Sequence, residues 1–223
     1  MLVAQFPKPR RLIAAAAVAL ATLAPALSAQ KANDDINIFL PTYAGPQNGD
    51  LDIVSAQVFY DPNIQKFAFT ATMNGPIGST SGAFYVWGLN KGAGTQGFAA
   101  IAPGVLFDAV MIMRPTTGIT VGPASVNDFF FFSGNTITGV VPLSFFPSTG
   151  FTPENYTWNL WSRATGPAGQ TSIADFAPDN SNNLLTVGPI PAAVLVTPEP
   201  ASVVLVGAGL FGMFVAARRR RVA

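Results

Sequence analysis

Apolar and polar residues alternate along the middle of the chain. In residues 54–60 every second residue is apolar, and Phe67, Phe69 and Ala71 repeat this pattern a few residues later. A period of two is typical of β-strands with one buried face. Asp61-Pro62-Asn63 lies between the two segments and supplies turn residues, so the pattern predicts a β-hairpin.

Further segments are typical of short strands, and clusters of Gly, Asn, Pro, Ser and Thr separate them. No window of twelve residues shows a convincing helical period. The additional predicted strands are residues 84–89, 108–113, 128–132, 136–141, 156–163 and 184–187. About eight short strands predict an all-β fold, namely a single jelly-roll-like β-sandwich over residues 30–196. At about 165 residues, such a domain buries most of its apolar surface without disulfides.

The N-terminal segment has the composition of a secretory signal peptide. Lys8, Arg10 and Arg11 precede an apolar run over residues 12–24, and small residues follow up to Ala29. We expect residues 1–29 to form an apolar signal helix that signal peptidase removes after Ala29. The alternative is a membrane anchor that the protein retains.

A second apolar run lies near the C-terminus. Residues 201–217 would form a helix about 26 Å long, enough to cross a bilayer. Four arginines follow it, Arg218, Arg219, Arg220 and Arg221. Because basic residues stay on the cytoplasmic side, the sequence predicts a transmembrane helix with the rest of the chain outside.

Pro198-Glu199-Pro200, the apolar run and the arginine cluster together resemble the PEP-CTERM sorting signal, over residues 197–223. One departure is Thr197, where that family usually has Val. The resemblance implies recognition of Pro198, Glu199 and Pro200 by an exosortase, a transpeptidase-like membrane enzyme of bacteria that make exopolysaccharide. It also implies an exported precursor anchored in the inner membrane, which then reaches the cell surface or the extracellular matrix. The alternative is an ordinary tail anchor.

Composition and charge exclude several classes of function. The chain has no Cys and no His, which excludes disulfides and thiolate zinc sites and removes the commonest general base. Residues 30–197 hold five basic and ten acidic side chains, so nucleic acid is not an expected partner. Glycoside hydrolysis needs two carboxylates, but Glu154 is the only Glu in this stretch and nothing in the sequence places a second acid opposite it. We therefore predict no catalytic residues and no enzyme activity.

The middle of the chain also resembles DOMON-like β-sandwiches. Residues 49–53, a strand, Tyr60-Asp61 and a Phe-rich strand are similar to the opening of such a domain, and residues 140–144 and 156–163 to its closing half. Related sandwiches include carbohydrate-binding modules, sometimes with calcium, and haem-binding domains. Haem is disfavoured here because the chain has no His ligand.

The tryptophans suggest a carbohydrate site. Trp158 and Trp161 differ by three positions, so on a strand they point to opposite faces. Trp161 shares its face with Asn159 and Arg163, which would place an indole for stacking between an amide and a guanidinium. The sequence thus predicts exopolysaccharide binding through Trp161, Asn159 and Arg163. The alternative is that these tryptophans pack in the core.

The acidic residues come in pairs, Asp34/Asp35, Asp50/Asp52 and Asp175/Asp179. Calcium prefers such oxygen ligands. We predict that Asp50 and Asp52 bind a structural calcium ion. The alternative assigns them to solvated turns. No other cofactor is expected.

Two hypotheses of function remain. One is an exported, non-enzymatic protein of the cell envelope or matrix that binds exopolysaccharide. The other is a purely structural or self-associating surface protein without a sugar ligand. A run of four phenylalanines at residues 129–132 predicts a strand that is buried on both faces or lies at an interface.

Overall fold

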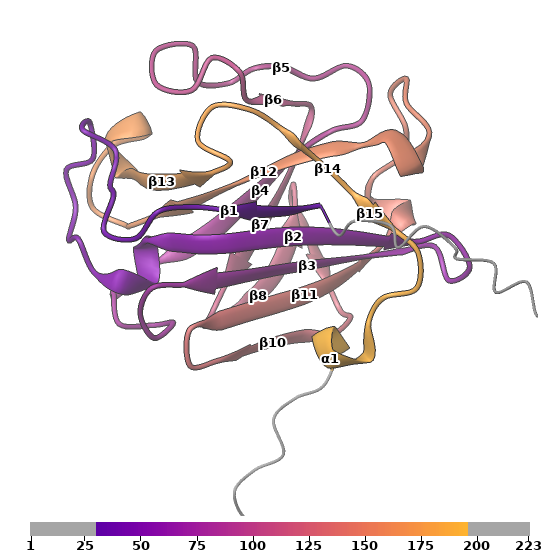
Figure 1. Cartoon of the computed structure of the whole chain (residues 1–223), viewed down its shortest axis with the longest axis horizontal. Coiled ribbons are helices and arrows are strands. Elements are labelled where there is room, and N and C mark those ends of the chain that lie inside the picture. Colours follow the sequence, from indigo (N-terminus) through magenta and orange to yellow (C-terminus); the bar gives the residue numbers. More distant parts are fainter. Residues whose placement is uncertain (1–29, 196–223) are drawn as a thin grey trace, which may run out of the picture.

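The computed structural model describes residues 30–195, and nearly all of their regular structure is β (Figure 1). The prediction of an all-β fold is confirmed. The strands are β1 (Lys31–Asn33), β2 (Ile53–Asp61), β3 (Lys66–Met73), β4 (Phe84–Asn90), β5 (Thr95–Gln96), β6 (Leu106–Phe107), β7 (Ala109–Arg114), β8 (Gly118–Val121), β9 (Ala124–Val126), β10 (Phe130–Ser133), β11 (Thr136–Pro142), β12 (Thr157–Arg163), β13 (Ile173–Ala177), β14 (Asn183–Leu184) and β15 (Thr186–Val187).

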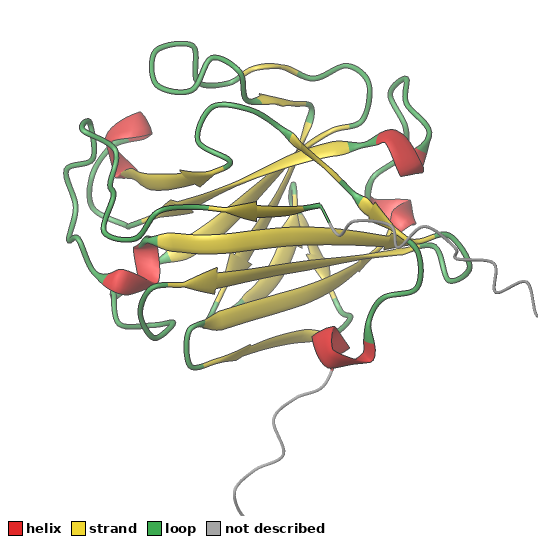
Figure 2. Ribbon diagram, in the orientation of Figure 1, coloured by secondary structure: helices red, strands yellow, loops and turns green. Residues whose placement is uncertain are grey.

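Helices in this part of the chain are short (Figure 2). They comprise one α-helix, α1 (Ala192–Leu195), and the 3-10 helices Gly49–Leu51, Leu143–Phe145, Pro153–Asn155 and Gly169–Ser172. Among residues 30–195 there is no helix of the length and apolarity needed to cross a bilayer. The predicted signal helix at residues 1–29 and the predicted transmembrane helix at 201–217 lie outside the described residues.

The strands form two large sheets that lie one in front of the other in Figure 1. Sheet A has the order β1-β2-β3-β11-β10, and β15 joins β2 in parallel. Sheet B has the order β13-β12-β4-β7-β8-β9, and β14 pairs with β12. Strands β5 and β6 form a separate two-stranded ribbon. All of these pairings are antiparallel except that of β15 with β2, and the antiparallel arrangement permits tight hairpins such as that of β2 and β3.

The predicted hairpin of residues 54–72 is confirmed as β2 and β3, whose register pairs Tyr60 with Phe67. The turn begins where the Asn63 amide donates to Asp61 Oδ1 at 2.9 Å. Gln65 closes the turn with a φ of 53°, in the left-handed region. The side chains that alternate inward from β3, Phe67 and Phe69, are fully buried.

One hydrophobic core lies between the two sheets and takes side chains from both. Phe69 of β3 meets Trp87 of β4 with ring centroids 5.4 Å apart, and Trp87 lies 5.4 Å from Trp158 of β12. Phe67 stacks on Tyr156 at 6.0 Å. These five aromatic residues join the sheets through large buried surfaces, which dominate the energetics of such cores.

The outer face of sheet B carries a second core. It is covered by residues 91–107, which we call the covering segment and which contain β5 and β6 (Figure 1). The buried members of this cluster are Val86, Phe98, Ala102, Val105, Trp161, Ile173 and Phe176. Loop 178–182 holds the covering segment down, since Asn180 and Asn182 accept hydrogen bonds from the amides of Gly104 and Leu106 at 2.7 and 2.9 Å.

The outer face of sheet A is divided. At one end Phe59, Ala68 and Val140 pack under Ile190 and Val194, so the C-terminal segment that ends in α1 covers this half. The other half stays open and is polar.

The phenylalanine run at residues 129–132 lies at the edge of sheet A instead of inside it. Strand β10 is the last strand in the order of that sheet. Phe130 and Phe131 are half-buried, and Phe132 is 38% exposed. The prediction of burial on both faces is therefore wrong, because the side chains of β10 keep part of their surface exposed, whereas the alternative of an interface stays a prediction.

Candidate functional site

The indole of Trp161 is buried and offers no surface for a sugar ring, so the predicted stacking platform is wrong. Trp161 is 2% exposed and lies with its ring centroid 4.9 Å from that of Phe98 and 5.2 Å from that of Phe107. The prediction that Trp158 and Trp161 face opposite sides is confirmed, since Trp158 belongs to the core between the sheets. The covering segment is the physical reason, because it buries a face that alternation alone leaves open.

Asn159 and Arg163 do share that face of β12, but their side-chain donors already have partners, while the buried Asn159 Oδ1 has none among the described residues. The Asn159 amide donates to the carbonyls of Pro178 and Ser181, at 2.5 and 2.8 Å, and the residue is fully buried. Arg163 donates to the Gly169 carbonyl at 2.7 Å. Partial burial lowers the pKa of the guanidinium. These bonds hold loops onto β12 and leave little capacity for a ligand.

Asp50 and Asp52, the predicted calcium pair, point to different partners. Both oxygens of Asp50 accept hydrogen bonds from Thr80, from its amide at 2.7 Å and its hydroxyl at 2.6 Å. Asp52 is also fully buried, and its Oδ2 accepts from the Asn37 amide at 2.7 Å and from Asn74 Nδ2 at 2.8 Å. The structure does not bring the predicted pair together as one site. Asp52 Oδ1 is buried and has no hydrogen-bond partner among the described residues.

Three other acids converge near Asp52. Each of Asp34, Asp175 and Asp179 offers a carboxylate oxygen, and these oxygens lie within 4.8 Å of one another. We call these three residues the aspartate cluster. Asp34 follows β1, and its amide donates to the Val54 carbonyl at 3.0 Å. Asp175 lies on β13, and Asp179 lies just beyond it.

Backbone amides hold Asp175 in place. It is 4% exposed, and its oxygens accept from the Ile53 amide at 2.7 Å and from its neighbour Phe176 at 2.8 Å. Asp34 Oδ1 accepts from the Asp35 amide at 2.9 Å. Asp34 Oδ2 is buried without a hydrogen-bond partner among residues 30–195.

Within residues 30–195, no ion pair involves the aspartate cluster. Burial raises the pKa of Asp175 to about 9, and the nearby charges of Asp34 and Asp52 add to the rise despite the two backbone hydrogen bonds. Burial also raises the pKa of Asp34 to about 6, with the charge of Asp179 as the next cause. Within residues 30–195 the one ion pair joins Lys66 to Asp128. The cluster is therefore a concentration of acidic groups with no cation of the described chain beside it.

The sequence contains the pairs Asp34/Asp35 and Asp175/Asp179, but no local pattern joins one pair to the other. The occurrence of acidic residues in pairs is a signal for an acidic site. The two pairs are some 140 residues apart, and this separation does not indicate that they are in contact. A shared site requires β13 to lie beside the start of β2. The hydrogen bond from the Ile53 amide to Asp175 shows that it does.

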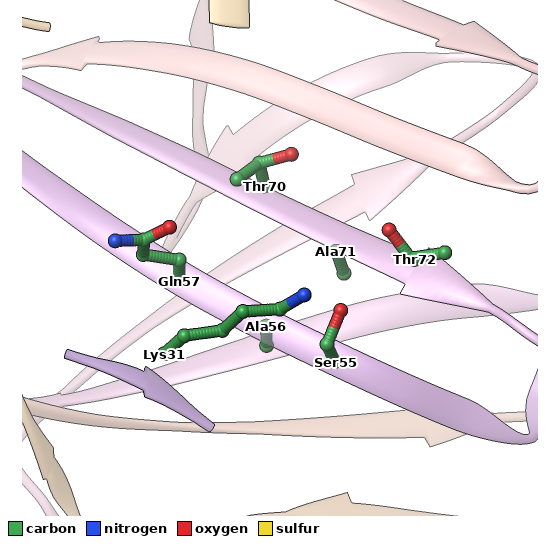
Figure 3. A pocket seen from close by; sticks show the side chains of 7 residues that line it. All are labelled: Lys31, Ser55, Ala56, Gln57, Thr70, Ala71 and Thr72. Carbon is green, nitrogen blue, oxygen red and sulfur yellow. The ribbon is translucent and has the colours of Figure 1, made fainter. Parts of the chain in front are cut away.

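The open half of the outer face of sheet A has a shallow hollow of about 150 Å³ (Figure 3). Lys31 extends from β1 over β2, while Ala56 and Ala71 point away from the opening (Figure 3). The lining residues are Lys31, Ser55, Ala56, Gln57, Thr70, Ala71 and Thr72. This surface presents hydroxyls, an amide and an ammonium group without any aromatic ring.

Comparison with known proteins identifies the end of the chain. Residues 196–221 match the family model described as the PEP-CTERM protein-sorting motif. The tail carries a PEP-CTERM sorting motif. The resemblance that the sequence indicated is thus confirmed, and the motif marks an exported protein that is sorted at the membrane by an exosortase. No curated protein and no solved structure matches the chain.

The PEP-CTERM match spans Pro198, Glu199 and Pro200 as well as the arginine cluster of residues 218–221. These residues, like the predicted signal peptidase site at Ala29, lie outside the described residues. The resemblance of the domain to DOMON-like sandwiches stays a prediction.

Proposed function

We propose that this PEP-CTERM protein is a non-enzymatic structural component of the cell envelope or extracellular matrix. In this proposal residues 1–29 are removed, residues 30–196 form a jelly-roll-like sandwich, and residues 201–217 anchor the precursor in the inner membrane. The observation that carries the proposal is the sorting motif at residues 196–221, attached directly to a domain with two packed sheets.

The chemistry of the domain supports a role without catalysis. The chain has no His and no Cys. Glu154 lies in the short helix Pro153–Asn155 and is exposed. The carboxylates that do converge surround Asp175, which is nearly buried and bonded to backbone amides. A general acid needs an approach for the substrate, and the burial of Asp175 opposes such an approach.

Two observations favour the structural role over sugar binding at β12. Trp161 is buried, so the face expected to stack on sugars is part of the core. Strand β10 ends sheet A with a half-exposed Phe132, and unpaired edge strands are sites where chains associate.

Processing of the tail provides the test. In the host, mass spectrometry should find mature protein that lacks residues 1–29 and is altered at the C-terminal tail. Deleting the exosortase should leave the tail uncut, and Glu199→Gln should slow its processing. Glu154→Gln makes the same charge change outside the motif and should leave processing unchanged. Identical C-terminal peptides in the wild-type and deletion strains would overturn the sorting part of the proposal.

A second candidate function is exopolysaccharide binding on the open polar half of sheet A. The observation that favours it is the hollow lined by Lys31, Ser55, Gln57, Thr70 and Thr72, whose groups suit a ligand rich in hydroxyls. Retention of the protein by host exopolysaccharide in affinity gel electrophoresis tests it. The double variant Lys31→Gln, Thr72→Val should lose retention, and Thr117→Val, in the exposed turn after β7, serves as control. Equal retention of all three proteins would exclude this surface.

A further inference from the structure

We propose that Asp34, Asp175 and Asp179, with Asp52 beside them, form a calcium site that joins the segment after β1 to sheet B. This inference goes beyond sorting and does not depend on how the tail is processed. The site differs from the sequence prediction, because it leaves out Asp50 and includes three acids that were not assigned to a metal.

The spacing of the carboxylates suits one ion. Calcium binds oxygen at about 2.3–2.6 Å, so two oxygens on opposite sides of it lie about 5 Å apart. The oxygens of Asp34, Asp175 and Asp179 lie within 4.8 Å of one another. A single calcium ion can therefore contact all three without a large movement of the backbone.

Unpaired buried oxygens at this place provide an independent reason to expect a ligand. Asp52 is fully buried and its Oδ1 has no hydrogen-bond partner in the described part of the chain. Asp34 is half-buried, and its buried Oδ2 atom likewise has no hydrogen-bond partner there. Buried carboxylates are normally paired or bound to a metal, because desolvation of an isolated charge is costly.

Hydrogen bonds fix Asp52 next to the cluster. The Asn37 amide, three residues beyond Asp34, donates to Asp52 Oδ2, and the Ile53 amide, directly after Asp52, donates to Asp175 Oδ2. Asp52 is thus attached to both segments that carry the other ligands. Backbone carbonyls and water would complete the six to eight oxygens that calcium takes.

The donor set favours calcium over other ions. All four side chains supply hard oxygen, and the chain has no His or Cys for a transition metal. Magnesium keeps several waters and demands regular octahedral geometry, which a dense group of carboxylates disfavours. Export also matters, since extracellular calcium modules function with dissociation constants of about 10⁻⁴–10⁻³ M.

The ligands come from parts of the chain that are far apart in sequence. Asp34 follows β1, Asp52 precedes β2, and Asp175 and Asp179 lie on and after β13. An ion bound here would link the segment after β1, the first long strand of sheet A and the edge strand of sheet B. Because the unfolded chain does not assemble these ligands, calcium binding would stabilise the folded state.

Thermal unfolding and titration calorimetry of the purified full-length chain test the site. In calcium at about 100 times its dissociation constant, the unfolding midpoint should rise by about 5–10 °C relative to EDTA, with one ion bound per chain. Asp179→Asn removes an exposed ligand, so it should fold normally in EDTA and lose at least tenfold in calcium affinity. Asp52→Asn should also weaken binding.

Asp35→Asn is the matched control, because Asp35 is exposed, adjacent to Asp34 and outside the cluster. It should bind calcium within about twofold of wild type. Four outcomes would overturn the proposal: no calorimetric binding, equal midpoints in calcium and EDTA, an equal loss in Asp35→Asn and Asp179→Asn, or an equal stabilisation by magnesium at the same concentration.

Discussion

The outer faces of the two sheets differ in what covers them. The outer face of sheet B is apolar and lies under the covering segment of residues 91–107, with Trp161 at its centre. The outer face of sheet A is covered over one half by the C-terminal segment, and its other half presents hydroxyls, amides and Lys31.

This difference shows what alternation along a strand does and does not establish. Alternation tells which residues share a face, and it correctly separated Trp158 from Trp161. It does not tell whether the second face meets water or another layer of the chain. In β4 and β12 five successive residues are buried, because both faces of these strands are covered.

The largest expected effect comes from Trp161→Ala. Removing a buried indole from the outer core of sheet B should destabilise the domain by about 3–5 kcal/mol. Chemical denaturation of the full-length chain gives this value directly. A change within about 0.5 kcal/mol is the range of ordinary surface substitutions. Such a result would mean that Trp161 is not part of a core and that the outer face of sheet B is as open as the polar half of sheet A.

A smaller effect is expected when a methyl group is added under the same indole. An ideal Cβ at Gly88 would lie 2.7 Å from Trp161 Cζ3 and 3.1 Å from Phe107 Cβ. Gly88→Ala should therefore cost about 1–3 kcal/mol through overpacking. In a double-mutant cycle with Trp161→Ala this cost should largely disappear, since the ring that clashes is gone. Simple additivity of the two variants would show that the clash lies elsewhere.

The covered half of sheet A should respond more weakly. Val194 is half-buried against the outer face of sheet A, and Val194→Ala should cost about 0.5–1 kcal/mol because two methyl groups lose part of their burial. Leu195 is 39% exposed and provides the comparison. Leu195→Ala should change the free energy of unfolding by less than Val194→Ala does. The reverse order would mean that Leu195, and not Val194, makes the stabilising contact with sheet A.

The smallest effect is expected on the open half of sheet A. Thr72→Val keeps the β-branched shape and removes one hydroxyl, so stability should stay within about 0.5 kcal/mol of wild type. The same denaturation experiment measures it. A loss above about 1 kcal/mol would mean that this surface is part of the packed structure and not a free face.

The sequence predicted the longer strands well because they alternate. The hairpin of β2 and β3, and strands β4, β7, β11 and β12, lie within one or two residues of their expected positions. Strand β13 was missed because all five of its residues are buried, which removes the period of two. Strands β1, β5 and β6 are too short to display a period.

The candidate sites were harder to predict than the strands. Asp52 was predicted as a ligand on local grounds, but the aspartate cluster takes Asp175 and Asp179 from a part of the sequence more than 120 residues away. Such contacts depend on which strands become neighbours, and no local pattern encodes that. The burial of Trp161 likewise depends on Phe98 and Phe107, which belong to a segment without long strands.

The position of α1 sets how far the folded domain stands from its sorting signal. Val194 is packed on sheet A, and Pro198 follows Leu195 by three residues. A fully extended chain spans at most about 3.6 Å per residue, so the tether between them is no longer than about 11 Å. An enzyme that acts at Pro198 would therefore work almost in contact with the domain. Releasing residues 188–195 from sheet A would lengthen that tether by up to about 29 Å at the same spacing, and the strength of this docking would control the enzyme's reach.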